Sequence, residues 1–331
     1  MRIAVIGAGS WGTAVSWLLG SKGYDVTVWA REQEIADGIN ANHRNPTYLP
    51  EVELPISVTA THDIALAVTG ADAAVMVTPS VGVRSTAEAM APYLGPDVPV
   101  VILSKGVEGG TSLLMTEIIA EVFGNDSRVA ALSGPNHAEE VSRGVPSATV
   151  IASHSEATAV FFQDLFSTPF FRVYTNDDVI GVELCGAGKN VVAIAAGMID
   201  GLGFGDNTKA SMMTRGLAEM ARLGAAMGAN PMTYMGLAGM GDLVVTCTSK
   251  HSRNRSLGEF VARGGTVEEW EAKSKMVAEG AVACRSIREL ASARGVDVPL
   301  TDKVYEILYE GHPATEAVAD LMERPTKTER G

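Results

Sequence analysis

The sequence predicts an α/β N-terminal domain with a mainly parallel sheet, followed by an all-α C-terminal domain. Short β-branched runs recur through the first half of the chain and almost vanish after about residue 180. Long segments rich in Ala, Met, Leu and Gly take their place. A length of 331 residues also suits two domains better than one. We expect these domains to span residues 1–188 and 189–331.

The expected strands are apolar runs without strict alternation, bounded by Gly or Pro. This pattern is typical of strands that are buried on both faces of a parallel sheet. Helical stretches separate several of the runs, as an α/β domain requires. The runs lie at 3–7, 25–30, 56–60, 73–79, 98–104, 128–134 and 148–153.

The second half of the chain contains long segments with the composition of buried helices. No run reaches the roughly 18 uninterrupted apolar residues of a membrane span. The segments therefore favour a helical domain and not a membrane anchor. They lie at 179–200, 207–228, 254–263, 276–295 and 299–310.

Charge and cysteine content narrow the possible functions. The net charge of −13 and the pI near 4.9 argue against a general nucleic-acid binder, which needs a basic face. The three cysteines, Cys185, Cys247 and Cys284, are far apart and form no C-x-x-C pair. They suggest neither a disulfide framework nor a metal site, and they fit a reducing, cytoplasmic location.

A glycine-rich turn follows the first expected strand. The segment "VIGAGSWG" places Gly7, Gly9 and Gly12 in G-x-G-x-x-G spacing, and a plausible helix and a second strand follow it. In a dinucleotide-binding unit, the three glycines allow a tight turn, close approach of a pyrophosphate, and close helix–strand packing. The helix N-terminus then faces the phosphates. The sequence therefore predicts a dinucleotide site in the first domain.

The residue after the second strand bears on which dinucleotide is bound. That strand normally ends in Asp or Glu when the ribose of NAD is bound, but "VWARE" presents Arg31 followed by Glu32. A cation there suits the 2′-phosphate of NADP, although a solvated arginine is the alternative. We expect NADPH to be preferred without NADH being excluded.

Other polar residues follow the later strands. In an open parallel sheet, ligands bind outside the carboxyl ends of the strands. "SKG" places Lys105 there, and "SGPNHA" places Gly134, Asn136 and Ala138 there. A lone lysine at a strand end is often a solvated surface residue, but several such ends converge on one crevice. We therefore expect Lys105 to contact a ligand.

One lysine stands in an otherwise apolar helical segment, "ELCGAGKNVVAIAAG". Loss of hydration favours the neutral amine, so burial lowers the pKa of a lysine such as Lys189 toward neutrality. Such a group can exchange a proton. The alternative is that the side chain extends along the surface to solvent. The position of Lys189 at the expected domain junction favours a catalytic role.

A basic cluster lies in "SKHSRNRSLG" at 249–258. Lys250, Arg253 and Arg255 alternate there with Ser252 and Asn254. Guanidinium groups bind the oxygens of a phosphate monoester bidentately, so the cluster favours a phosphorylated substrate. The alternative is a solvated helix start that Ser252 caps.

The ordered set of motifs resembles that of the NAD(P)-dependent glycerol-3-phosphate dehydrogenases of bacteria, over essentially the whole chain. The resemblance implies a Rossmann-type domain joined to a helical substrate and catalytic domain. It also implies a cytoplasmic homodimer that interconverts dihydroxyacetone phosphate and sn-glycerol 3-phosphate and supplies glycerol phosphate for glycerophospholipid synthesis. The motifs are "GAGSWGTA", "SKG", "SGPNHAEEV", "GAGKNVVAIAAG", "GLGFGDNTKA", "TRGLAEM", "GMGDLVVTCTS" and "SRNRSLG".

The resemblance also implies residue roles at matching positions. Lys189 is the general acid and base. The implied cofactor contacts are Ser10, Trp11, Arg31, Lys105, Ala138, Arg253, Val277 and Glu279. The implied substrate contacts are Lys105, Gly134, Asn136, Lys189, Asp242, Ser252, Arg253 and Asn254.

The mechanism expected from these roles is hydride transfer from NAD(P)H to C2 of dihydroxyacetone phosphate while Lys189 protonates the forming alkoxide. Asp242 positions or tunes Lys189, and no metal is required. Three features depart from the bacterial pattern and affect fine contacts. Asn136 stands where Ser or Thr is common, His137 replaces a common Phe, and "EGAVAC" lacks a Thr after the Glu-Gly pair.

Two other functions remain possible at this point. A related two-domain dehydrogenase could act on a 2-hydroxy acid or a ketopantoate-like compound, but the cluster around Arg253 favours a phosphate. A catalytically silent dinucleotide sensor would bind cofactor tightly without turnover. The presence of Lys189, Asp242 and Arg253 together argues against the sensor.

Overall fold

The computed structural model describes residues 1–274, 277–326 and 328–329. Its N-terminal part is one eight-stranded sheet in the order β3-β2-β1-β4-β5-β6-β7-β8. All neighbouring strands pair in parallel except β6 and β7, so the prediction of a mainly parallel sheet is confirmed. The strands are β1 Arg2–Ile6, β2 Asp25–Trp29, β3 Val58–Thr61, β4 Ala73–Met76, β5 Val100–Ile102, β6 Val129–Ser133, β7 Ser147–Ala152 and β8 Phe171–Asn176.

The first six strands lie in the order 3-2-1-4-5-6 that is characteristic of doubly wound dinucleotide-binding sheets. Helices cover both faces of the sheet, and neighbouring residues of β1 point into separate cores. Ile3 and Val5 join one buried cluster, whereas Ala4 and Ile6 join the other. The helices of this part are α1 Ser10–Ser21, α2 Gln33–Asn42, α3 Ile64–Val68, α4 Val83–Met90, α5 Met115–Phe123, α6 Ala138–Val141 and α7 Glu156–Phe166.

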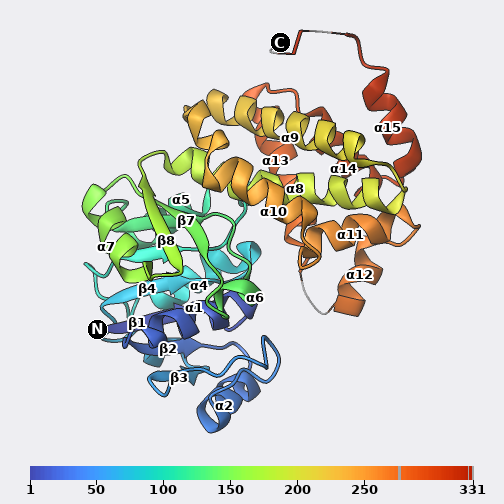
Figure 1. Cartoon of the computed structure of the whole chain (residues 1–331). Helices are drawn as coiled ribbons and strands as arrows, with labels where there is room; N and C mark the ends of the chain where they lie inside the picture. Colours follow the sequence, from blue (N-terminus) through green and yellow to red (C-terminus); the bar gives the residue numbers. More distant parts are fainter. Residues whose placement is uncertain (275–276, 327, 330–331) are drawn as a thin grey trace.

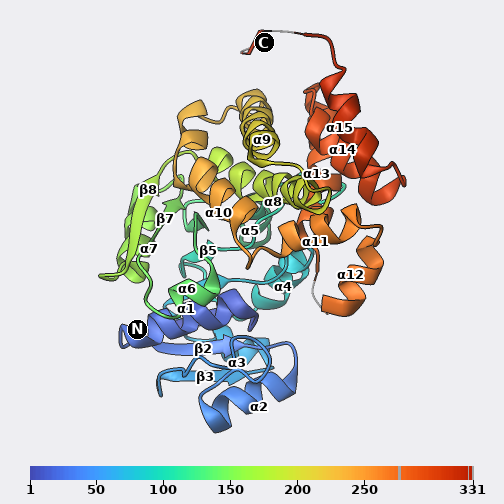
Figure 2. The ribbon, with the colours of Figure 1, turned by 45° about the vertical axis from the view of Figure 1, so that its right-hand side comes forward.

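The C-terminal part is helical, and it packs around one central helix, α8, Val179–Gly201 (Figures 1 and 2). Two short helices, Pro231–Met235 and Leu237–Gly241, connect α9 to α10. The expected helix at 276–295 begins at Glu279, and residues 275–276 lie outside the described part of the chain. The other helices are α9 Asp206–Ala226, α10 Asp242–Thr248, α11 Arg253–Ala262, α12 Val267–Ser274, α13 Glu279–Arg294, α14 Pro299–Tyr309 and α15 Ala314–Met322.

Helix α8 is long and apolar enough to cross a membrane by length and composition alone. Within the described part of the chain it is the one helix that meets this test, and 94% of its most apolar window is buried inside the protein. It is therefore the core helix of the C-terminal part. The expected domain boundary between Gly188 and Lys189 falls inside α8 and stays a prediction.

Glycines bring α8 and α11 unusually close. A Cβ added at Gly197 would lie 1.9 Å from the Arg255 carbonyl oxygen, and one at Gly258 would lie 1.9 Å from the Ile194 carbonyl oxygen. Only a residue without a side chain permits such contact between two helix backbones. This crossing sets the position of the start of α11, which carries Arg253 and Asn254.

Candidate active site

The glycine-rich loop joins β1 to α1 at the carboxyl end of the sheet. Gly7 has φ of 125°, and a Cβ there would lie 2.9 Å from the Val77 carbonyl oxygen. A Cβ on Gly12 would lie 1.9 Å from the Gly7 carbonyl oxygen, whereas one on Gly9 would meet no heavy atom within 4 Å. Gly7 and Gly12 are thus required by the fold, while Gly9 leaves open space beside the backbone. That space fits close approach of a pyrophosphate.

Ser10 and Trp11 form the first turn of α1, where backbone N–H groups have no partner within the helix. Arg31 lies just beyond β2, and its side chain is 82% exposed. Its Nε and Nη2 donate to Glu32 Oε1 over 2.9 and 2.7 Å. An exposed ion pair of this kind contributes little stability, so the guanidinium group can turn to another anion at small cost.

Lys189 is buried in α8, with 8% of its side chain exposed. Its Nζ donates to Asp242 Oδ1 and, over 2.9 Å, to Thr246 Oγ1. Burial lowers the pKa of Lys189 to about 8, with Asp242 opposing and Lys105 reinforcing that shift. The side chain does not extend to solvent, so it has the environment of a group that exchanges a proton near neutral pH.

Asp242, the first residue of α10, lies between two lysines. Its Oδ2 accepts a hydrogen bond from Lys105 Nζ over 2.7 Å, while Oδ1 accepts one from Lys189. Burial acts to raise the pKa of Asp242, but the two ammonium groups outweigh it and hold that pKa below its usual value. Lys105 comes from the loop after β5, so this carboxylate joins the sheet to the helical part.

The glycine at 186 makes room for this arrangement. A Cβ there would lie 3.1 Å from Ser133 Oγ and 3.2 Å from Lys105 Cγ. The Lys105 stem therefore packs directly against α8 on its way to Asp242. The end of the same lysine lies 3.5 Å from the Gly134 carbonyl oxygen.

A second polar group lies where α8, α11 and α13 meet. Asn254 Nδ2 donates to Asn190 Oδ1 over 2.9 Å, and Asn254 Oδ1 accepts from the Gly280 N–H over 2.9 Å. Ser252 is buried and caps α11, because its Oγ accepts from the Arg255 N–H. Arg253, the first residue of α11, is exposed.

Arg255 does not belong to this group, so its assignment to the phosphate cluster is wrong. Its Nη1 donates to Asp200 Oδ2 over 2.9 Å and contacts Glu259. Lys209 is also paired with Asp200. The reason is helical geometry, since a residue two positions after Arg253 lies on nearly the opposite side of α11.

The loop after β6 contributes Gly134, Asn136 and Ala138. Gly134 has φ of 156° and backs onto Thr149, whose Oγ1 is 3.4 Å from Asn136 Nδ2. Ala138 begins α6 and packs with Trp11.

His137 lies between Asn136 and Ala138 in this loop. Its buried Nε2 has no hydrogen-bond partner in the described part of the chain. Burial, then the charge of Lys189, lowers the pKa of His137.

Glu279 connects the start of α13 to the loop after β4. Its carboxylate accepts hydrogen bonds from the Ser80 N–H at 3.1 Å and the Ser80 hydroxyl at 2.5 Å. Burial, partly offset by those bonds, raises the pKa of Glu279. Val277, two residues earlier, is exposed. Glu279 therefore holds the start of α13 against the loop after β4.

The predicted residues thus form several groups. Lys105, Lys189 and Asp242 touch one another, whereas the glycine loop, Arg31 and Val277 lie outside that cluster. The sequence interpretation missed Thr246, which contacts both Lys189 and Asp242. Its spacing of four residues from Asp242 on a helix was the available signal.

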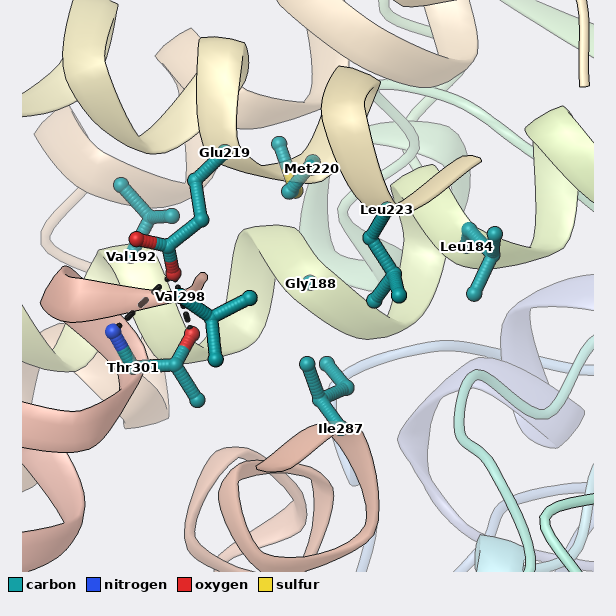
Figure 3. A pocket seen from close by; sticks show the side chains of 9 residues that line it. All are labelled: Leu184, Gly188, Val192, Glu219, Met220, Leu223, Ile287, Val298 and Thr301. Atoms are coloured by element: carbon teal, nitrogen blue, oxygen red, sulfur yellow. Dashed lines mark hydrogen bonds between the residues drawn. The ribbon is translucent and has the colours of Figure 1, made fainter. Parts of the chain in front are cut away.

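The cavity in Figure 3 is separate from this site. It lies between α8, α9, α13 and α14, and Leu184, Gly188 and Val192 line it from α8. Glu219 caps the start of α14 there by accepting from the N–H groups of Leu300 and Thr301. Figure 3 shows its bonds to Thr301. The cavity has a volume of about 10 Å³, which suits one water molecule. The cavity is therefore too small to be the substrate site.

Comparison with family models gives matches to both parts of the chain. The family described as NAD-dependent glycerol-3-phosphate dehydrogenase N-terminus matches residues 2–159. The corresponding C-terminus family matches residues 178–319.

Individual relatives agree with these matches. The chain is 49% identical to an NAD(P)+ glycerol-3-phosphate dehydrogenase from Streptomyces griseus, over 100% of this chain and 98% of the relative. It is 51% identical to the protein of the same name from Parafrankia, over 98% and 97% of the two chains. The crystal structure of glycerol-3-phosphate dehydrogenase from Coxiella burnetii has a TM-score of 0.93 at 37% identity, covering 98% of this chain and 99% of the other.

Proposed function

The chain belongs to the NAD-dependent glycerol-3-phosphate dehydrogenase family, and from this premise we propose that it interconverts dihydroxyacetone phosphate and sn-glycerol 3-phosphate with NADPH as the preferred reductant. The observation that carries the proposal is the buried Lys189 in contact with Asp242, beside Lys105 at the carboxyl edge of the sheet. The family match removes the 2-hydroxy-acid and ketopantoate alternatives.

Lys189 is the proton donor for the C2 oxygen of the ketone and the proton acceptor in the reverse direction. Its lowered pKa allows both protonation states near neutral pH, which general acid–base catalysis requires. The nicotinamide, when bound, supplies or accepts the hydride at C2. Thr246 and Asp242 hold the Lys189 ammonium group in place.

Asp242 tunes Lys189 by charge. A carboxylate between two lysines stabilises both ammonium groups, while Lys105 disfavours a second positive charge at Lys189. Lys105 also reaches the Gly134 carbonyl oxygen, so it is well situated to contact the substrate beside Asn136.

Arg253, Ser252 and Asn254 bind the substrate phosphate. The support is their common position at the start of α11, where a helix N-terminus and a guanidinium group both favour an anion. The Asn190 and Gly280 contacts fix the Asn254 amide. A fixed phosphate aligns C2 for hydride transfer.

The cofactor lies along the glycine loop, with Gly7, Gly9, Ser10, Trp11 and Gly12 around its pyrophosphate. The open space at Gly9 is the structural support for this placement. Arg31 turns from Glu32 to the 2′-phosphate of NADPH, which gives the preference over NADH. The remaining cofactor contacts are Lys105, Ala138, Arg253, Val277 and Glu279.

The proposal extends to assembly and physiological role. We expect a cytoplasmic homodimer that supplies glycerol phosphate for glycerophospholipid synthesis. The three cysteines are buried and free, which suits a reducing compartment. Met232 and Met235 are exposed on one short helix of the C-terminal part and offer apolar surface for a second copy. Light scattering after size exclusion measures the assembly directly.

The decisive experiment follows the loss of reduced-nicotinamide absorbance with dihydroxyacetone phosphate. It compares NADPH with NADH, and the wild type with Lys189→Ala. Turnover that is faster with NADPH and collapses in the folded variant supports the substrate, the cofactor preference and Lys189 together. Tight NADPH binding without turnover in the wild type would instead identify a dinucleotide sensor.

A further inference from the structure

A buried asparagine outside the motifs quoted above packs against the back of the glycine loop and bonds to it. Asn45 lies in the segment between α2 and β3, and its side chain is fully buried. Asn45 Nδ2 donates to the Ala8 carbonyl oxygen over 2.8 Å and to Thr13 Oγ1 over 2.9 Å. We infer that Asn45 is a positioning residue that orients the loop for the dinucleotide phosphates.

The bond to Ala8 determines where the next N–H points. Ala8 stands between Gly7 and Gly9, and the chain has no cis peptide bond among the described residues. In a trans peptide, the C=O and the following N–H point in opposite directions. Because Asn45 holds the Ala8 carbonyl on its own side, the Gly9 N–H points away from it.

The Gly9 N–H remains available to a ligand. Within residues 1–274, 277–326 and 328–329, it donates no hydrogen bond. Gly9 is also the loop glycine beside which a Cβ would meet nothing. An oriented, unpaired donor next to open space is the arrangement that binds a phosphate oxygen.

Asn45 is itself held rigidly. Its Oδ1 accepts from the Thr47 N–H at 3.0 Å and the Tyr48 N–H at 2.9 Å. Two donated and two accepted bonds use the full capacity of the amide. The bond to Thr13, in α1, fixes the loop and its helix as one unit. The Asn45 amide therefore transmits the position of residues 45–48 to the phosphate loop.

The inference rests on the proposed function, because it assigns the loop to the cofactor phosphates. Asn45 touches neither the lysine cluster nor the start of α11 within the described structure. Its replacement should therefore change affinity for the dinucleotide while leaving the affinity for dihydroxyacetone phosphate nearly unchanged. A general loss of folding would lower all activities together.

The test uses Asn45→Asp in the full-length protein. A carboxylate can still accept from Thr47 and Tyr48, but it presents an acceptor to the Ala8 carbonyl oxygen, which repels it. We expect the Kd for NADPH, measured by calorimetry, to rise about 10-fold or more. The KM for dihydroxyacetone phosphate should stay within about two-fold, because the phosphate-binding residues on α11 are untouched.

Gln163→Glu is the matched control. Gln163 on α7 also donates its amide to a backbone carbonyl, that of Val173, over 2.9 Å. This variant loses the same kind of bond in the same part of the protein, far from the glycine loop. It should lose some thermal stability and keep the wild-type Kd for NADPH.

The outcomes separate the inference from the function. A folded Asn45→Asp protein with wild-type Kd overturns the inference while wild-type turnover preserves the function. A wild type that binds neither NADPH nor NADH overturns both the inference and the proposed function. If Asn45→Asp does not fold, Thr13→Val removes one of the two acceptors and leaves Asn45 in place. That variant should weaken NADPH binding by a smaller factor, and an unchanged Kd would count against the inference.

Discussion

At the scale of single residues, the chemistry depends on one ammonium group that is removed from water. Lys189, on α8, donates hydrogen bonds to Asp242 and Thr246, on α10. Lys105 donates to the other oxygen of the Asp242 carboxylate. Desolvation lowers the pKa of Lys189 and the Asp242 charge raises it, so the balance sets the pH at which the proton is exchanged. That balance can be measured.

The two reaction directions should have opposite pH dependences. Ketone reduction needs the protonated lysine, so its kcat should fall as the pH rises through about 8. Alcohol oxidation needs the neutral amine, so its kcat should rise over the same range. Steady-state kinetics in both directions measure the two midpoints, and Lys189→Met should lower kcat by roughly 10²- to 10⁴-fold.

Asp242→Asn tests whether the charge of Asp242 sets the pKa of Lys189. Because the Asp242 charge raises the pKa of Lys189, its removal should move the midpoint of the pH profile to lower pH. The maximal rate should also fall, since the ammonium group loses a hydrogen-bond partner of full charge. A folded Asp242→Asn protein with an unmoved midpoint would show that another group titrates in the profile.

Gly9→Ala should weaken cofactor binding without harming the fold. Gly9 has ordinary backbone angles, φ −71° and ψ −176°, and an added Cβ meets no atom of the chain. The methyl group would occupy the space of the pyrophosphate, so the Kd for NADPH should rise about 10-fold or more. Calorimetry measures the affinity, and thermal unfolding should show little change.

Gly12→Ala provides the contrast. Its Cβ would lie 1.9 Å from the Gly7 carbonyl oxygen, so the loop and the helix must separate. The unfolding temperature should fall clearly in this variant. If Gly9→Ala were the less stable of the two, the packing argument for these glycines would be mistaken.

Several individual residues could be predicted from the sequence because their chemistry conflicts with their surroundings. A lysine in an apolar helix and a lysine at a strand end are both visible in the printed sequence, and Lys189 and Lys105 do meet at Asp242. Thr246 was missed because a threonine in a helix is not unusual in itself. Arg255 was misassigned because composition alone does not say which side of a helix a residue occupies.

At the scale of secondary structure, apolar runs identified seven of the strands, and Ala-rich segments identified the long helices. Strand β8 was missed because it is an edge strand in which Arg172 and Tyr174 are exposed, so it lacks a continuous apolar run. Helix α10 was not predicted as a separate element because its seven residues are too few for a clear period. Buried strands carry the stronger signal.

The α8–α11 crossing should be sensitive to one methyl group. Gly197→Ala places a Cβ 1.9 Å from the Arg255 carbonyl oxygen, so the helices must move apart. We expect the free energy of unfolding to fall by about 1–3 kcal/mol or more, as in other overpacked cores. The KM for dihydroxyacetone phosphate should rise as well, because α11 carries Arg253 and Asn254. Denaturant titration and steady-state kinetics measure the two effects.

Gly205→Ala is the control for that substitution. Gly205 precedes α9, has a negative φ of −87°, and an added Cβ meets nothing within 4 Å. It should change the free energy of unfolding by less than about 1 kcal/mol. A loss in Gly197→Ala no larger than that in Gly205→Ala would contradict the packing argument for the crossing, because alanine is the better helix former inside α8.

At the scale of the whole molecule, the sheet and the helical part are joined by contacts between residues far apart in the chain. Glu279 bonds to Ser80, and Asp242 bonds to Lys105. The change in composition near residue 180 predicts two parts, but no local pattern shows which residues pair across them. The family resemblance assigned Lys105 and Asp242 to one substrate site, but it did not predict the contact of Glu279 with Ser80.

Glu183 is a further buried carboxylate that links the helical part to the sheet. It belongs to α8 and accepts hydrogen bonds from the Thr116 N–H at 3.0 Å and from the Thr116 hydroxyl, at the start of α5. Burial raises the pKa of Glu183 to about 7, although the Thr116 bonds act in the opposite direction. Between pH 4.5 and about 7, the folded protein therefore keeps a proton on Glu183, whereas the unfolded chain, in which this carboxyl has a pKa of 4.5, releases it.

Glu183→Gln should change how stability depends on pH. Between pH 4.5 and about 7 the folded state binds more protons at Glu183 than the unfolded state does. The stability that protonated Glu183 contributes is therefore complete below pH 4.5 and is lost as the pH rises through about 7. A neutral Gln can still meet Thr116 and removes that decline, which is on the order of 3 kcal/mol for this shift. Denaturant titrations across this pH range should therefore show a flatter curve for the variant, and Glu88→Gln, on the exposed face of α4, controls for the loss of one negative charge. If the free energy of unfolding depended on pH in the same way for wild type and Glu183→Gln, Glu183 would already be ionised in the folded protein. Water or a neighbouring group would then stabilise its charge where the sheet and the helical part join.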